Sequence, residues 1–238
     1  MSSLSPPGVR AMFGRIVPRY DLLNRLMSLG RDGHWRRAAA AAAAGPRAGV
    51  ALDIGTGTGD MAIELRRHGA ARVIAADFSA PMLAAARGKT GAVDGVSFVL
   101  GDALQLPFPD TTFDTVTNAF LLRNLADLSA GLAEMARVLR PGGRLVCLDM
   151  TQPPRGPFGA AYRLYFNHLL PPVAAAISGD RAAYRYLPQS LRGFPDATAL
   201  AHLLRKSGLI DVRVRRLGGG TVALHTGVKP PPRKGQAR

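Results

Sequence analysis

The chain has 238 residues, with 31 Lys and Arg against 16 Asp and Glu, and a formal net charge of +15 at pH 7. This length suffices for one full hydrophobic core, and the positive charge favours an anionic partner, either nucleic acid or acidic lipid headgroups. A single cysteine, Cys147, excludes an internal disulfide framework and indicates a reducing compartment.

Neither a secretory signal core nor a membrane span is expected from the sequence. The alanine run at 38–44 is the most uniform apolar stretch, yet a helix needs about 20 apolar residues to cross a bilayer. We therefore expect a cytoplasmic protein, and a peripheral contact with the inner face of the cytoplasmic membrane stays open.

The N-terminal part precedes any strand pattern. Residues 1–8 have the composition of a mobile leader. Residues 9–44 show two helical patterns broken near Pro18, with apolar positions on one side and arginines between them. This segment is either an amphipathic element that touches a membrane or a helical cap packed on the core with solvated arginines.

Alternating strand and helix patterns follow. Short apolar runs predict five parallel strands, at 50–54, 72–77, 97–100, 113–118 and 144–149. Helices are expected between most of them: at about 59–67, after the cap Ser79 with Pro81 in the first turn, and at about 129–139, stopped by Pro141-Gly142-Gly143. Repeated β-α units imply right-handed crossovers and one doubly wound α/β sheet.

The alternation of strand and helix patterns ends after the fifth strand. Residues 151–195 gather aromatic residues and prolines and are interpreted as a lid over the carboxyl edge of the sheet. A helix is expected at 196–206, followed by strands at 209–217 and 221–229 that meet in a hairpin. These elements predict a Rossmann-like, seven-stranded, mostly parallel sheet in a single domain spanning 9–229, and a disordered basic tail at 230–238.

The glycine-rich stretch 55–59 (Gly-Thr-Gly-Thr-Gly) follows the first strand directly. Such a turn lets backbone approach a ligand closely, but it has neither the Gly-Lys-Ser/Thr of a phosphate loop nor the GxGxxG spacing of a dinucleotide site. Three acids, Asp53, Asp77 and Asp102, end three successive strands. A cationic, ribose-bearing ligand without phosphate suits them, and S-adenosylmethionine is such a ligand. A purely structural turn is the alternative.

Several segments resemble the ubiquinone/menaquinone biosynthesis C-methyltransferases, over about residues 10–229. The matching stretches are Tyr20-Asp21-Leu22-Leu23-Asn24, Met27-Ser28-Leu29-Gly30, Trp35-Arg36, 52–60, Gly101-Asp102-Ala103, 106–110, Phe120 with Leu122-Arg123-Asn124, Glu134-Met135, Arg137-Val138-Leu139, 184–190, Phe194-Pro195 and 219–225. The resemblance implies a class I S-adenosylmethionine-dependent fold and methyl transfer to a ring carbon of a polyprenylated quinol, either demethylmenaquinol or the equivalent ubiquinone precursor.

Departures from the family pattern lie beside the expected pocket. Ala119 stands where a serine is frequent, Leu121 where glycine is usual, and 148–151 (Leu-Asp-Met-Thr) where Leu-Glu-Phe-Ser is usual. They leave the acceptor open, with another lipophilic phenol as an alternative substrate.

The expected cofactor contacts combine the glycine turn with the ends of the first four strands. They are Asp53, Gly55, Thr56, Gly57, Thr58, Gly59, Asp77, Phe78, Asp102, Ala103 and Asn118. No Cys, His or Asp cluster has the spacing of a metal site, so no metal is expected.

Four residues are candidates for the chemistry. The acidity of a hydroquinone is close to that of tyrosine, with a pKa of about 10, so methylation at carbon needs a base and a stabilised phenolate. Arg123 is the expected cation, Asn124 orients a water or a ring oxygen, and Tyr20 closes over the pocket beside Asp21. Asp102 contacts the adenine amino group and is also a candidate proton acceptor.

Structural roles compete with each of these assignments. Arg123 and Asn124 could start a helix, although Asp127 is an alternative cap; Tyr20 could be a core tyrosine and Asp102 a turn former. Among other polar residues, His225 is interpreted as a core histidine. Glu134 is interpreted as a structural helix residue.

Two functions of other classes remain as alternatives. An RNA methyltransferase fits the charge, but Asn118-Ala119-Phe120-Leu121 lacks the Asn/Asp-Pro-Pro-aromatic turn, and Cys147 lies inside a strand rather than at a catalytic turn. Nucleic acid is therefore not the expected partner. A lipid-binding adaptor without activity would have lost the glycine turn or the second acid. Tail length of the quinol and formation of a homodimer stay open.

Overall fold

A computed structural model describes residues 17–45, 49–91, 93–170, 172, 190–191 and 193–232. The predicted leader, the N-terminal segment up to Ile16, most of the predicted lid after Leu170 and the tail from 233 lie outside the described residues. The Tyr-x-Tyr-Leu-Pro stretch at 184–188 is among them.

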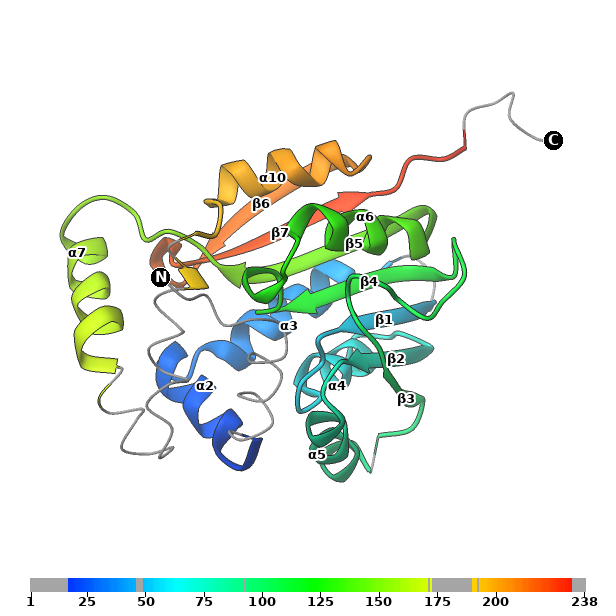
Figure 1. Cartoon of the computed structure of the whole chain (residues 1–238), viewed down its shortest axis with the longest axis horizontal. Helices are drawn as coiled ribbons and strands as arrows, with labels where there is room; N and C mark the ends of the chain where they lie inside the picture. The colour runs from blue at the N-terminus through cyan, green and yellow to red at the C-terminus, as the bar shows by residue number, and fades with distance from the viewer. Residues whose placement is uncertain are drawn as a thin grey trace.

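The described residues build a seven-stranded sheet in the order β3-β2-β1-β4-β5-β7-β6 (Figure 1). The strands are β1 (Val50–Ile54), β2 (Arg72–Asp77), β3 (Val96–Leu100), β4 (Phe113–Ala119), β5 (Leu139–Met150), β6 (Ile210–Leu217) and β7 (Val222–Val228). Neighbouring pairs among β1 to β5 are parallel, whereas β7 runs antiparallel to both β5 and β6. This confirms the predicted mostly parallel sheet closed by a hairpin.

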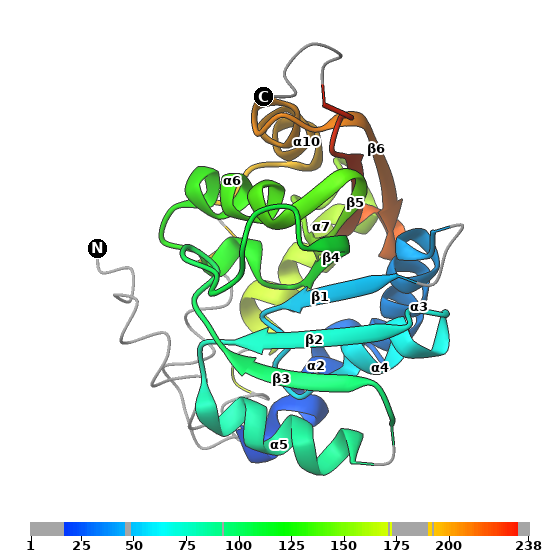
Figure 2. The same cartoon turned by 90° about the vertical axis from the view of Figure 1, so that its right-hand side faces the viewer.

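Helices cover both faces of the sheet (Figure 2). They are α2 (Tyr20–Ser28), α3 (Asp32–Ala43), α4 (Asp60–Arg67), α5 (Ala80–Thr90), α6 (Leu128–Val138), α7 (Pro157–Leu164) and α10 (Ala197–Lys206), with a π turn at Tyr165–Leu169 and 3₁₀ turns at Val17–Arg19, Leu122–Asn124 and Gly218–Gly220. α6 and α10 pack on one face, and α3, α4 and α5 lie on the other. No helix within the described ranges is long and apolar enough to cross a bilayer.

Part of the alanine run lies on the buried face of α3. Ala39 and Ala40 have no exposed surface and pack with Met61 and Leu65 of α4. Small side chains let α3 approach the sheet and α4 closely, which the run alone did not reveal.

Helix caps match the sequence signals. The hydroxyl of Ser79 accepts from the amide of Met82, and the carboxylate of Asp196 accepts from the amides of Thr198 and Ala199. Asp127 accepts from the amide of Ala130 and caps α6. Each oxygen satisfies amides that have no partner within the helix.

Two boundaries differ from the prediction. β5 begins at Leu139 rather than Arg144, because the proline-glycine stretch is drawn into the sheet by bonds from Gly142 N to Lys229 O (2.8 Å) and from Lys229 N to Gly143 O (2.9 Å). Near the N-terminus, the described helices are separated at Leu29–Arg31 and not at Pro18, which lies in a 3₁₀ turn. Leu29 (φ 51°) and Gly30 (φ 75°) adopt the left-handed conformation that ends a helix.

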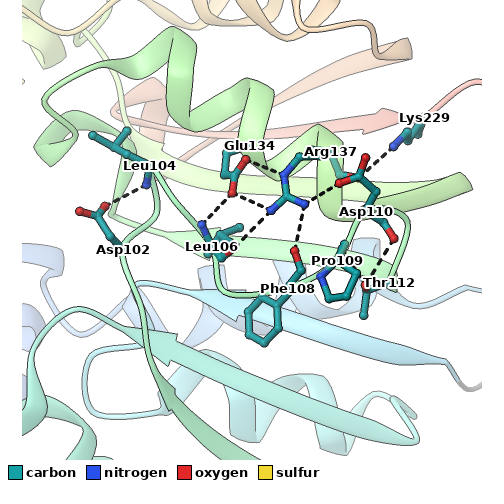
Figure 3. A network of polar contacts seen from close by, with 10 residues as sticks. All are labelled: Asp102, Leu104, Leu106, Phe108, Pro109, Asp110, Thr112, Glu134, Arg137 and Lys229. Carbon is teal, nitrogen blue, oxygen red and sulfur yellow. Dashed lines mark hydrogen bonds and ion pairs between the residues drawn. The ribbon is translucent and has the colours of Figure 1, made fainter.

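The loop between β3 and β4 has no helix and is held by Arg137 of α6 (Figure 3). Its guanidinium donates to the carboxylates of Glu134 (2.7 Å) and Asp110 (2.6 Å) and to the carbonyls of Leu106 and Phe108. Glu134 in turn accepts from Leu106 N at 2.7 Å, which agrees with its predicted structural role. One arginine therefore replaces a helix in fixing the loop that follows Asp102.

Replacing Arg137 with methionine should lower the free energy of unfolding by about 2 kcal/mol, because several charge-assisted hydrogen bonds are lost together. Urea denaturation measures the change. The matched control is Arg67→Met, whose arginine is 68% exposed and pairs only with Glu64, and it should change stability by less than about 0.5 kcal/mol. Equal effects of the two substitutions would contradict the assigned role of Arg137.

Candidate functional site

The site lies at the carboxyl ends of β1 and β4, where the strand order reverses and where doubly wound sheets bind ligands. The glycine turn after β1 faces the segment after β4. A Cβ placed on Gly55 (φ +66°) would come within 2.8 Å of Leu121, and one on Gly57 (φ +56°) within 3.4 Å of Tyr20. These glycines are needed both for their conformation and for this close approach.

Two buried carboxylates lie under the turn. Asp53 has no exposed surface and accepts from the hydroxyls of Thr56 (2.6 Å) and Thr117 (2.9 Å). Burial raises the pKa of Asp53 to about 7, although these hydroxyls oppose the rise. Asp77, at the end of β2, accepts from the amides of Gly57 (2.8 Å) and Ser79 (2.9 Å). The acids predicted to hold a cationic ligand are thus held rigidly by the turn itself.

Helix α2 closes over the glycine turn. The carboxylate of Asp21 accepts from the Thr58 hydroxyl and from Lys89 Nζ, both at 2.7 Å. Burial opposes ionisation of Asp21, but the bonds from Lys89 and Thr58 outweigh it and lower the pKa of the carboxyl. Burial raises the pKa of the Tyr20 phenol, and the neighbouring Asn24 amide opposes that rise. The structure therefore brings Tyr20 and Asp21 to the turn.

A first cavity, of about 40 Å³, lies between α2, the glycine turn and the segment after β4. Its lining is Tyr20, Gly55, Gly57, Asp77, Phe78, Met82, Ala119, Phe120, Leu121 and Asn124. Six of the residues predicted for the cofactor or the chemistry therefore meet here. The cavity is closed by α2, and a space of this size holds about one water.

Other predicted cofactor residues lie away from this cavity. Asp102 is exposed, and one of its oxygens accepts from Leu104 N at 2.9 Å, as in an ordinary turn (Figure 3). Ala103 is buried in the core, and the Asn118 amide donates to Cys147 Sγ on β5 at 3.1 Å and to Met135 Sδ on α6 at 3.5 Å. Gly59 caps α4 at φ 88°. A side-chain contact between Asn118 and the cofactor finds no support in this arrangement.

Arg123 forms a buried ion pair just beyond β4. Its Nη1 lies 2.6 Å from Asp149 Oδ1, and the two side chains are 7% and 1% exposed. Arg123 Nη1 and Asn124 Nδ2 both donate to the carbonyl of Phe120 at 3.1 Å. Since Asp127 caps α6, Asn124 is not needed as a cap for that helix.

A second cavity, of about 30 Å³, adjoins Arg123. Its lining is Asn24, Met27, Ser28, Asp32, Trp35, Phe120, Arg123, Met150, Tyr162 and Val222. Phe120 lines both cavities and adopts φ 61°, unusual for a bulky residue. Its ring lies 5.4 Å from the Arg36 guanidinium and 5.8 Å from that of Arg123. Such strain is typical of functional sites.

Sequence reasoning missed several of these residues. Asp149 near the end of β5 carries the same signal that identified Asp53 and Asp77, an acid at the carboxyl end of a strand. Phe120 was part of a quoted motif, but its backbone conformation has no sequence signature. Asn24 and Tyr162 come from α2 and α7, and no spacing in the chain links them to Arg123.

Two other titratable groups are buried without reaching either cavity. Burial raises the pKa of the Cys147 thiol to about 12, which keeps it protonated and unreactive. His225 is 1% exposed, its Nε2 bonds the Ala197 carbonyl at 2.8 Å, and burial lowers its pKa. The expectation of a core histidine is confirmed. Within the described part of the chain, no three His, Cys, Asp or Glu side chains converge as a metal site.

The residues around the first cavity suit S-adenosylmethionine. Asp77 lines the cavity and offers a carboxylate to ribose hydroxyls, Asp53 lies fully buried beneath the turn and outside the lining, and the glycine backbone leaves room where a Cβ would meet Tyr20. A phosphate would be repelled by the two acids, which fits a phosphate-free ligand.

Comparison with known proteins agrees with this geometry. The family model described as "ubiE/COQ5 methyltransferase family" matches residues 1–229. The chain belongs to this family. It is similar to the demethylmenaquinone methyltransferases of Deinococcus radiodurans, at 50% identity over 93% of this chain and 92% of the relative, and of Thermus thermophilus, at 49% identity over 92% and 100%.

Solved structures support the fold of this family member. An S-adenosylmethionine-dependent methyltransferase from Thermotoga maritima superposes with a TM-score of 0.65 at 21% identity, covering 92% of this chain and 99% of that one. One from Aquifex aeolicus gives 0.55 at 20% identity, covering 76% and 82%. At such identities the likeness concerns the fold alone.

The burial of Asp53 predicts a pH dependence of stability. Its carboxyl ionises near pH 4 in the unfolded chain and near pH 7 in the folded one, so the unfolded state binds fewer protons in between and stability falls as pH rises through this window. Asp53→Asn should remove that fall and stabilise the cofactor-free protein at pH 8 by on the order of 3 kcal/mol. Asp94→Asn, at an exposed position, is the control. Parallel pH profiles of the wild type and Asp53→Asn would contradict this.

Proposed function

We propose that this family member is an S-adenosylmethionine-dependent C-methyltransferase that converts demethylmenaquinol to menaquinol. The observation that carries the proposal is the buried Arg123 guanidinium, placed between the glycine turn and an aromatic cavity. The names of the relatives, both demethylmenaquinone methyltransferases, support this acceptor.

The reaction replaces a ring hydrogen by methyl. The new C–C bond forms as the S–CH₃ bond breaks, S-adenosylhomocysteine leaves, and the ring proton is released, so that quinol and sulfonium give methylated quinol, thioether and H⁺. S-adenosylmethionine supplies the electrophilic methyl group. The protein must supply alignment and an electron-rich ring carbon.

Arg123 makes the ring carbon nucleophilic. A nearby cation favours loss of a hydroquinone proton, whose pKa is otherwise about 10. In a site with little water, this stabilisation of the phenolate is stronger than in solution. Asn124, beside Arg123, orients a water or a ring oxygen, and Tyr20 and Phe120 exclude solvent from the space between donor and acceptor.

We assign cofactor binding to the glycine turn and to the acids Asp53 and Asp77. Asp77 receives the ribose hydroxyls, and Asp53 balances the positive charge of the methionine part of the donor. The assignment of Asp102 to the adenine or to proton transfer remains a prediction, since its carboxylate lines neither cavity.

The direct test supplies labelled S-adenosylmethionine with reduced demethylmenaquinone, the reduced demethylated ubiquinone precursor, or bulk RNA. We expect label in the naphthoquinol. Arg123→Met should lower kcat/KM by about 100-fold or more, with donor affinity within twofold of wild type, because the phenolate loses its cation. The control Arg72→Met changes an exposed arginine and should be neutral.

Each other result has a definite meaning. Label in the benzoquinol precursor alone would change the acceptor, and label in RNA alone would overturn the proposal. Full activity of Arg123→Met would show that the Arg123 cation does not contribute to the reaction.

The lipid tail of the acceptor explains why the surface of α2 and α7 is basic and partly apolar. Leu22 on α2, Leu29 directly after it, and Phe158 and Leu164 on α7 are more than half exposed, as is Leu169. The two helices are joined by a bond from Tyr165 Oη to Leu26 O at 2.9 Å and lie on the same side of the molecule (Figure 1). We propose that this docking face lies on anionic membrane.

Arginines on the same elements complement anionic headgroups. Arg19, Arg25, Arg31 and Arg163 are all exposed, and each well-placed arginine near an anionic membrane contributes about 1 kcal/mol. Apolar side chains among them add burial in the interface.

Vesicle sedimentation tests the docking face. Leu164→Asp should weaken binding to phosphatidylglycerol vesicles by about tenfold, because a buried apolar contact becomes a repelled charge. Ile210→Asp alters a comparably exposed apolar residue on β6 and should change binding much less. Equal losses of vesicle binding in the two variants would show that binding depends on net charge alone and not on this face. Size-exclusion chromatography of the same samples would distinguish a monomer from a homodimer.

A further inference from the structure

One face of α2 runs from the first cavity to the second. Tyr20, Asn24, Met27 and Ser28 are spaced by three or four residues and therefore share a side of the helix. Tyr20 lines the cavity at the glycine turn, whereas the other three line the cavity beside Arg123. Asn24 thus stands where the two cavities adjoin.

Two side chains that line the second cavity carry a buried donor without a hydrogen bond of normal geometry. The donors are Nε of Arg123 and Nδ2 of Asn24. The Asn24 amide also lies beside the Tyr20 phenol, where burial raises the pKa of the phenol and the amide opposes that rise. Leaving such groups unpaired is costly, and native structures avoid it unless a ligand or water completes them. Among the described residues, the other buried polar atoms without partners, on Asn118, Thr151 and His225, do not belong to the lining of this cavity.

The remaining walls are mainly flat or apolar. Trp35, Phe120, Met150 and Val222 surround the two donors, and the Trp35 and Phe120 rings are 6.4 Å apart. A ligand that fits must therefore combine an aromatic body with an oxygen acceptor.

We infer that Asn24 positions the acceptor ring, by donating from Nδ2 to the same ring oxygen that receives Arg123 Nε. This inference rests on the proposed function and adds a residue to it. A phenolate oxygen held by both donors satisfies each of them and fixes the rotation of the ring, so that the carbon to be methylated faces the glycine turn.

The ring enters this cavity when α2 moves. The cavity has a volume of about 30 Å³, far less than a naphthalene ring requires. α2 is followed by two residues with positive φ, Leu29 and Gly30, and is tied to the cofactor turn and α5 by the Asp21–Lys89 pair, whose side chains are 38% and 33% exposed. An ion pair this exposed is weak enough to open.

Trp35 is the single tryptophan of the chain, so its fluorescence reports directly on this cavity. A short-tailed 2-prenyl-1,4-naphthoquinone, added to the full-length protein, should quench it. Asn24→Leu keeps the size of the side chain and removes the donor; we expect a 10- to 100-fold weaker quinone Kd. S-adenosylmethionine affinity should stay within twofold. The matched control is Asn167→Leu, at an exposed asparagine.

A second variant guards against a failure of folding. Asn24→Asp is isosteric and places a carboxylate beside the phenolate, so kcat/KM with the reduced quinol should fall at least as far as in Asn24→Leu. Thermal unfolding of all variants checks their integrity. In a Tyr20→Phe background, Asn24→Leu should weaken quinone binding and lower kcat/KM by the same factors as in the wild-type background. The reason is that Asn24 acts on the acceptor ring and not through the tyrosine.

The outcomes separate this inference from the proposed function. If the wild type methylates quinol but Asn24→Leu binds and turns over quinone as well as wild type, the role of Asn24 is refuted. It is equally refuted if methylation proceeds while Trp35 stays unquenched, or if Asn24→Leu loses donor affinity to the same extent. If the wild type methylates no quinol, the proposed function fails and this inference fails with it.

Discussion

The buried ion pair between Arg123 and Asp149 is the interaction on which the site depends. Desolvation makes an isolated buried guanidinium very costly, so the arginine stays in the interior because the carboxylate lies 2.6 Å from it. Arg123 follows β4 and Asp149 belongs to β5, so the pair also joins the carboxyl ends of two strands. Asp149 engages Nη1, whereas the buried Nε has no hydrogen-bond partner among the described residues, and Arg123 lines an aromatic cavity in which a negative oxygen could complete it.

The same edge of the sheet carries negative charge on the cofactor side. Asp53 and Asp77 are buried beneath the glycine turn, and Arg123 lies across Phe120 from them. In the proposed reaction, the cationic donor and the anionic acceptor would therefore each meet an opposite charge, with one strained phenylalanine, Phe120, lining both cavities. α2 supplies a wall to both, which couples access of the two ligands to a single helix.

Much of this arrangement could be predicted from the sequence because the signals are local. The short apolar strand runs, the GxGxG turn, the acids at the carboxyl ends of β1 and β2, and the cap Ser79 each depend on a few adjacent residues, and the structure places each where the sequence predicted it. The roles of Asn118 and Asp102 stay predictions: the Asn118 amide bonds Cys147 on the neighbouring strand, and the Asp102 carboxylate bonds its own turn. Asn24, Tyr162 and Asp149 meet Arg123 only through tertiary packing, which no spacing encodes.

The most direct test of the account is the pH dependence of single-turnover methyl transfer to demethylmenaquinol, because it reports ionisation of the bound ring. With wild-type protein, the rate should rise with an apparent pKa well below the value of about 10 for a free phenol. With Arg123→Met, that pKa should move up by about 1 to 3 units. The same apparent pKa in both proteins would contradict the claim that the buried Arg123–Asp149 pair creates the nucleophile.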